Sequence, residues 1–175
     1  MRVIKALAVS SVLFLSSLVV AGEYQHLIDG SVNLSNTRTT SDSAGESKIN
    51  QFELFVKYRN QIQPTLYLVS GFSFLDSATI NAFGLELGIE KDLFGRSDNV
   101  EIGPGIVAGF TDGEYGTQDY RSFGFIPYAF LRSFIGGSRA YVMWTLGYQF
   151  TFADRDGVDE KSRGITMSFG FGLGF

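Results

Sequence analysis

The stretch ITMSFGFGLGF, residues 165–175, alternates large apolar residues with small ones without a break. The large residues all fall on one parity: Ile165, Met167, Phe169, Phe171, Leu173 and Phe175. In a β-strand this period of two places all six side chains on one face and only Thr, Ser and Gly on the other. A soluble sheet rarely ends on a bare apolar row, because such a row promotes aggregation. The pattern therefore favours a strand that faces lipid and closes a barrel.

Seven earlier segments are candidate strands, and all but the one at 120–132 show the same alternation. They cover residues 24–35, 49–59, 65–74, 80–90, 99–111, 120–132 and 139–152. Each has roughly ten residues or more, the length that a tilted membrane-spanning strand needs. The total of eight is even, as in bacterial barrels of this kind. The sequence therefore predicts an all-β chain folded as an eight-stranded antiparallel up-and-down transmembrane β-barrel.

The segments between these strands predict the two ends of the barrel. Polar stretches at 36–48, 112–119 and 153–163 are expected to form extracellular loops, and turns near 60–63, 91–98 and 133–138 to lie in the periplasm. Pro104 cannot donate a hydrogen bond to a ladder, which predicts a bulge or local break in its strand. The segment 120–132 is apolar on both parities, so the sequence assigns it no register.

The first 22 residues have the features of a secretory signal peptide. Arg2 and Lys5 precede an apolar run at 6–20, which ends in the small residues of VVAG. The run has about 15 residues, whereas a membrane helix needs roughly 20. An uncleaved anchor helix is the alternative. We therefore expect two parts, a signal peptide at 1–22 and an outer-membrane barrel domain at 23–175.

Composition supports one domain and excludes some classes of partner. Removing 22 residues from 175 leaves about 153, and losing Arg2 and Lys5 moves the formal charge from −4 to −6. An acidic chain lacks the basic footprint of nucleic-acid binding. The 21 glycines and 17 phenylalanines suit a curved sheet with aromatic girdles. A soluble lipocalin-like barrel is the alternative, but it would turn its apolar face inward.

Charged residues fall on the predicted inner face of the barrel. The predicted interior network contains Glu53, Lys57, Arg59, Glu86, Glu101 and Arg139, and Asp29 and Glu90 share the same face. An eight-stranded barrel is just wide enough for its own side chains, so these charges must pair or stay hydrated. Glu86 and Glu101 are expected close to one level, with Lys57, Arg59 or Arg139 between them. The favoured interpretation is a salt-bridge network that fills the lumen, and a gate or narrow pore is the alternative.

The export signal, the eight alternating strands and the terminal Phe175 resemble the small outer-membrane β-barrels of Gram-negative bacteria. The resemblance covers nearly all of the mature chain and lies in the architecture, without a subfamily motif. It implies location in the outer membrane and contact with lipid and lipopolysaccharide. It also implies that the barrel-assembly machinery reads the terminal strand through Phe169, Phe171, Leu173 and Phe175.

Barrels of this architecture include lipid A deacylases and palmitoyl transferases, which use a histidine with a serine. The single histidine here is His26, and the residue two positions on is Ile28, not serine. A plain interfacial histidine is therefore expected, with no catalytic residue and no cofactor. The segment 154–160 is rich in oxygen ligands but lacks the EF-hand pattern, so a solvated acidic loop is expected rather than a metal site.

The sequence thus favours a structural or surface-interaction barrel that is not an enzyme, with an unidentified surface partner at its outer loops left open. Arg155, Lys161 and Arg163 are candidates to meet the phosphates of lipopolysaccharide. A narrow pore or conduit for small molecules is the second hypothesis. A lipid-modifying enzyme is a distant third.

Overall fold

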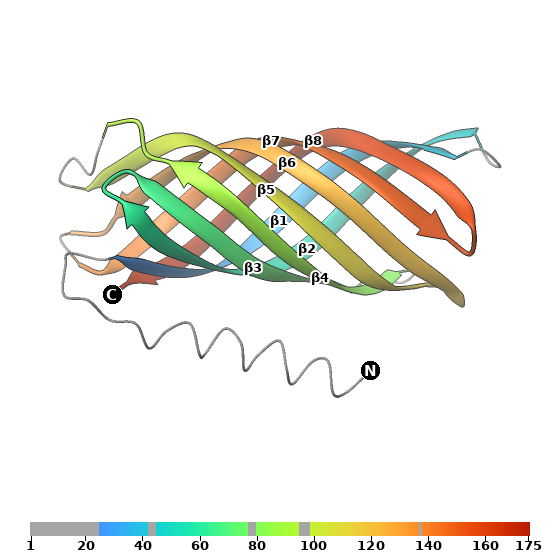
Figure 1. Cartoon of the computed structure of the whole chain (residues 1–175), viewed down its shortest axis with the longest axis horizontal. Helices are drawn as coiled ribbons and strands as arrows, with labels where there is room; N and C mark the ends of the chain where they lie inside the picture. The colour runs from blue at the N-terminus through green and yellow to red at the C-terminus, as the bar shows by residue number, and fades with distance from the viewer. Residues whose placement is uncertain (1–24, 42–44, 77–79, 95–98, 137) are drawn as a thin grey trace.

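A computed structural model describes residues 25–41, 45–76, 80–94, 99–136 and 138–175. Its eight strands are β1 (His26–Ser41), β2 (Gly45–Gln63), β3 (Leu66–Asp76), β4 (Ile80–Lys91), β5 (Val100–Tyr115), β6 (Gln118–Phe134), β7 (Ala140–Arg155) and β8 (Val158–Gly174). Each strand pairs antiparallel with the next, and β8 pairs with β1 to close the barrel (Figure 1). The predicted fold class is confirmed. The predicted signal peptide lies outside the described residues.

The outer face of the barrel is apolar on every strand. Large exposed side chains occur at Leu34, Phe52, Leu68, Leu87, Ile106, Phe123, Leu146 and Phe171, one from each strand in turn. The opposite parity faces inward, as the buried Asp29, Ser31 and Asn33 of β1 show. A soluble barrel would hide the apolar set, so the lipocalin-like alternative is wrong. Among the described residues, no helix is long and apolar enough to span a membrane.

The strands extend well past the belt of apolar residues. The stretches predicted as loops at 112–119 and 153–163 are mostly strand, and β1 and β2 take up most of 36–48. β7 and β8 are joined by Asp156 and Gly157, whose φ angles of 49° and 79° suit a two-residue hairpin with both residues left-handed. The sequence misled here because both faces of a strand are polar once it leaves the lipid, which removes the alternation.

Pro104 does not break its strand. β5 runs through Pro104 and pairs it with Ala129 of β6. On the other side of β5, the ladder with β4 stops at the pair of Glu90 and Gly105 and does not reach Pro104. The missing N–H therefore costs no bond in that ladder. The β6–β7 ladder omits Ile126 and Pro127, and a register shift lies between Gln61 and Gln63 of β2.

The last residue secures the seam between the first and last strands. His26 N donates to Phe175 O at 3.1 Å, and Phe175 N donates to His26 O at 2.9 Å. The two rings also approach, with centroids 5.8 Å apart. This end of the seam lies at the end of the barrel where Figure 1 marks the C-terminus.

Candidate functional site: the barrel interior

Two arginines and three carboxylates form one buried ion network across the half of the lumen that lies toward the C-terminus. Arg59 Nε donates to Glu90 Oε2 at 2.8 Å, and Arg59 Nη1 donates to Asp29. Arg132 Nη1 donates to Glu101 Oε2 at 2.6 Å, and Arg132 Nη2 donates to Glu90. Glu90 thus joins two guanidinium groups that lie on β2 and β6. All five side chains are at most 2 % exposed.

Each carboxylate of the network also accepts a hydrogen bond from a tyrosine. Tyr141 Oη donates to Asp29 Oδ2 at 3.2 Å. Tyr128 Oη donates to Glu90 Oε1 at 2.7 Å, and Tyr67 Oη donates to Glu101 Oε1 at 2.9 Å. The Arg132 guanidinium further lies 4.8 Å from the Tyr67 ring centroid. Such dense pairing is what allows charges to stay buried, because an ion without partners would lose its hydration uncompensated.

Two inward glycines make room for two of these tyrosines. A Cβ at Gly105 would lie 2.6 Å from the Tyr128 ring and 2.9 Å from Glu90 Cγ. A Cβ at Gly172 would lie 2.3 Å from the Tyr141 ring. At these positions the space above the glycine is filled by a neighbouring side chain. Gly105 therefore leaves no open channel, because Tyr128 lies across it.

A separate ion pair, Lys57 with Glu86, lies farther from the C-terminal end of the barrel than the network does. Lys57 Nζ is 2.7 Å from Glu86 Oε2 and 4.6 Å from the Phe55 ring centroid. Glu86 pairs in register with Gly109 of β5, eight positions along that strand from Glu101. The expectation that Glu86 and Glu101 share a level is therefore wrong, and each has a cation of its own.

Arg139 does not belong to the interior. It is exposed in the turn between β6 and β7, and Arg132 of β6 occupies the place in the network that Arg139 was predicted to fill. The error follows from the ambiguous alternation of 120–132. The register pairs Glu101 with Arg132 directly, a relation that the sequence does not reveal. Of the other predicted interior residues, Glu53, Lys57, Arg59, Glu86 and Glu101 all lie on the inner face.

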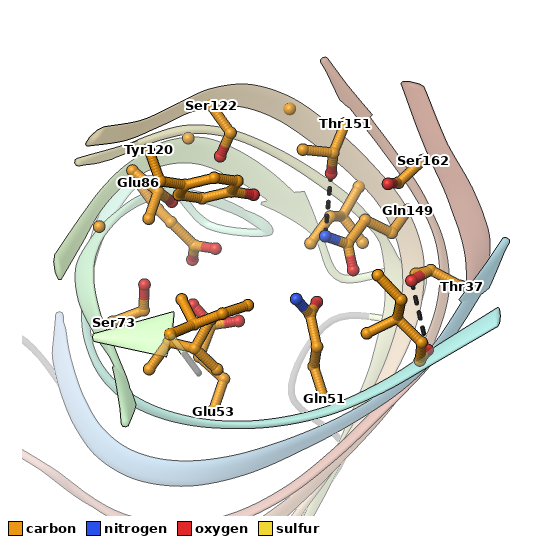
Figure 2. Close-up of a pocket in the computed structure, with 18 of the residues that line it drawn as sticks. Thr37, Gln51, Glu53, Ser73, Glu86, Tyr120, Ser122, Gln149, Thr151 and Ser162 are labelled. Atoms are coloured by element: carbon orange, nitrogen blue, oxygen red, sulfur yellow. Dashed lines mark hydrogen bonds between the residues drawn. The ribbon is translucent and has the colours of Figure 1, made fainter. Parts of the chain in front are cut away.

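A polar vestibule occupies the other half of the lumen, toward the β5–β6 and β7–β8 hairpins. Its empty volume is about 920 Å³, including the solvent space at its mouth. Figure 2 shows Gln51, Glu53 and Gln149 extending into this space. Gln149 Nε2 donates to Thr151 Oγ1 at 2.9 Å, and the remaining wall carries many Ser and Thr hydroxyls (Figure 2).

A smaller space of about 370 Å³ lies between the vestibule and the network. It shares Phe55, Val107 and Ile126 with the vestibule and reaches Arg59 and Tyr128 of the network region. The lumen is therefore hollow toward the β5–β6 and β7–β8 hairpins and filled toward the end of the barrel that holds the C-terminus.

The other candidates of the sequence analysis are His26 and the acidic segment 154–160. His26 has the parity of the outer face but is buried beside Tyr58 and Phe175, and its Nδ1 is 2.7 Å from Tyr58 Oη. In the part of the chain that the structure describes, no three His, Cys, Asp or Glu residues gather in a way that could hold a metal ion. Arg155 pairs inward with Glu160 at 2.5 Å, so the prediction that it meets lipid phosphates is wrong.

Comparison with known proteins gives the fold its context. No protein-family model and no curated protein matches the chain. The structure of Neisserial surface protein A is similar at 14 % identity with a TM-score of 0.56, covering 89 % of this chain and 100 % of that one. The outer-membrane protein OprG from Pseudomonas aeruginosa is similar at 12 % identity with a TM-score of 0.55, covering 89 % and 98 %. The chain therefore has the fold of the small eight-stranded outer-membrane β-barrels of Gram-negative bacteria.

Proposed function

We propose that this chain is an integral barrel of the Gram-negative outer membrane with a structural or surface-interaction role, and that its lumen does not conduct ions. One observation carries the second part. The buried ion network and its tyrosines join side chains from β1 to β7 across the barrel, and the vestibule lies on one side of this network. The apolar belt and the fold shared with outer-membrane barrels support the first part.

The partners follow from the same surfaces. The belt meets membrane lipid, and the extracellular rim meets lipopolysaccharide. We assign Phe169, Phe171, Leu173 and Phe175 to recognition by the barrel-assembly machinery, since they are the lipid-facing side chains at the end of the closing strand. A surface partner would meet stiff hairpins, because β5–β6 and β7–β8 continue as strands to their tips.

Recordings in a planar bilayer test the closed lumen. The wild-type barrel should be silent or open rarely, because a packed eight-stranded interior leaves no aqueous path. Arg132→Ala should introduce openings, since it removes a side chain that spans the lumen. Glu90→Gln provides a second variant that keeps the volume while breaking the charge pairing. Heat-modifiable mobility on gels should verify that each variant is folded.

A narrow pore is the second candidate. The two stacked spaces above the network support it, because they leave the network as the barrier between vestibule and periplasm. Steady wild-type conductance, lost when Gly105 is replaced by a bulky residue, would reject the closed lumen and establish the pore.

A further inference from the structure

Cationic side chains gather on the outer surface where the apolar belt ends. Arg163 of β8 pairs in register with Arg38 of β1, which pairs with Lys48 of β2. All three are exposed and have the parity of the lipid-facing residues. Lys161 lies two positions beyond Arg163 on the same face. We call Arg38, Lys48, Lys161 and Arg163 the basic patch. With strands about 4.8 Å apart, its row of three spans about 10 Å.

The rows beneath the patch fix its level relative to the lipid. Met167, Leu34 and Phe52 form one register row across the same three strands, each about half exposed on the lipid-facing side. The next outward row contains Asn36 and Asn50, joined by a hydrogen bond of 2.6 Å. The row after that contains the cations Arg163, Arg38 and Lys48. The patch row lies four positions from the apolar row, roughly 13 Å along the strand before tilt, so the patch lies at the boundary between acyl chains and headgroups.

The patch is a local excess of positive charge on an acidic chain. Glu46 is the described acid within it and lies 2.6 Å from Arg38, which leaves four cations against one anion, or +3. The formal charge of the whole chain is −4.

The strands next to the patch at the same rim have the opposite sign, and the two regions meet on β8. One register row across β5 to β8 holds Asp112, Arg121, Asp154 and Asp159, three acids against one base, or −2. Arg121 is occupied there by Asp112 at 3.2 Å. The rim is therefore polarised around its circumference, with the boundary on β8, where the exposed Asp159 lies two positions beyond Lys161.

We propose that the basic patch binds the phosphate groups of lipid A in the outer leaflet, while the acyl chains of that lipid lie on Leu34, Phe52 and Met167. The charge of the patch and its level relative to the apolar row both favour this ligand. Arg163 offers a planar fork that matches phosphate oxygens, Arg38 adds the part of its guanidinium that Glu46 leaves uncovered, and Lys48 and Lys161 add point charges. A soluble anion would not need the apolar row below, whereas a phosphorylated lipid uses both. The site adds a specific lipid contact to the proposed outer-membrane role and rests on the chain lying in that membrane.

The test compares two matched double variants in phosphatidylcholine nanodiscs without divalent cations. Lys48→Gln with Arg163→Gln removes one lysine and one arginine from the patch. Lys91→Gln with Arg121→Gln removes the same residue types from exposed positions outside it. Retention of lipid A by each folded barrel is measured by native mass spectrometry. We expect about tenfold weaker retention by the patch variant, from the loss of charge-assisted hydrogen bonds, and no change in the control.

Two further lipids separate the phosphate from other causes. Lipid A without its phosphates should not be retained by the wild type, and phosphatidylglycerol should be retained no better by the wild type than by the patch variant. Equal loss in both double variants would overturn the proposal, as would retention of dephosphorylated lipid A. Preferential retention of phosphatidylglycerol would overturn it too, by showing a general anion surface. A chain that fails to enter the outer membrane in cells would contradict the proposed function while leaving the nanodisc result intact.

Discussion

At the scale of single residues, the interior is specified by contacts that involve unlike side chains. Arg132 reaches two carboxylates and two aromatic rings, and Glu90 reaches two arginines and a tyrosine. Glycines set the space for these contacts, since Tyr128 reaches Glu90 by lying over Gly105. A change at one member therefore affects partners on several strands.

Arg132→Met should lower the free energy of unfolding by about 3–5 kcal/mol, because Glu90 and Glu101 lose a buried partner. Water that reaches the two carboxylates would reduce this loss. Arg139→Met is the matched control, since Arg139 is exposed in a turn. Urea unfolding followed by the fluorescence of Trp144 measures both. Equal small effects would mean that the lumen is a wet space.

Gly105→Ala should destabilise the barrel by about 1–3 kcal/mol, because the added Cβ forces Tyr128 away from Glu90. Gly30→Ala on the outer face is the control, as its Cβ would meet nothing within 4 Å. The same unfolding assay compares them. A neutral Gly105→Ala would show that Tyr128 has room to move.

At the scale of elements, closure of the sheet depends on the pairing of β8 with β1. That seam ends in the two backbone hydrogen bonds between His26 and Phe175, with the ring of Phe175 against His26. β8 carries the largest contrast between its two faces, which suits it to be the strand that completes the ring.

Deleting Phe175 should reduce the amount of heat-modifiable barrel in the outer membrane, more than it reduces the stability of barrels that do form. The deletion removes two bonds and the terminal aromatic, whereas Phe175→Leu keeps the bonds and an apolar side chain. Quantitative gels of membrane fractions distinguish the two. Normal assembly of the deletion variant in cells would argue against a role for Phe175 as assembly signal.

At the scale of the whole molecule, three zones share one continuous sheet. An apolar belt surrounds the barrel, an ion network fills the half of the lumen toward the C-terminus, and a polar vestibule occupies the other half. The paired strands β1–β2, β5–β6 and β7–β8 extend furthest at the vestibule end of the barrel (Figure 1). The charged residues on their outer faces lie beyond the apolar belt.

The single tryptophan tests the position of the belt. Trp144 is 54 % exposed on the outer face, beside the Phe169 ring with centroids 4.4 Å apart. Its fluorescence in vesicles should be quenched strongly by lipids brominated on their acyl chains and weakly by aqueous acrylamide. The reverse pattern would place this face in water and contradict the transmembrane barrel.

The sequence by itself determined the strand count, the lipid-facing parity and most of the inner charges, because alternation along a strand depends only on the order of residues. Alternation alone assigns the outer face to Phe52 and Leu54 and the inner face to Glu53, and it separates Leu85 and Leu87 from Glu86 in the same way. Neither assignment requires knowledge of a neighbouring strand. What only the tertiary structure decided was which charges meet. The pairing of Glu101 with Arg132, the bridge through Glu90 and the row of Arg163, Arg38 and Lys48 depend on register and strand tilt across up to seven strands. Register is a relation between strands, and no single strand contains it. Because both faces of β6 are apolar in sequence, the sequence did not show that Arg132 points inward and joins the network.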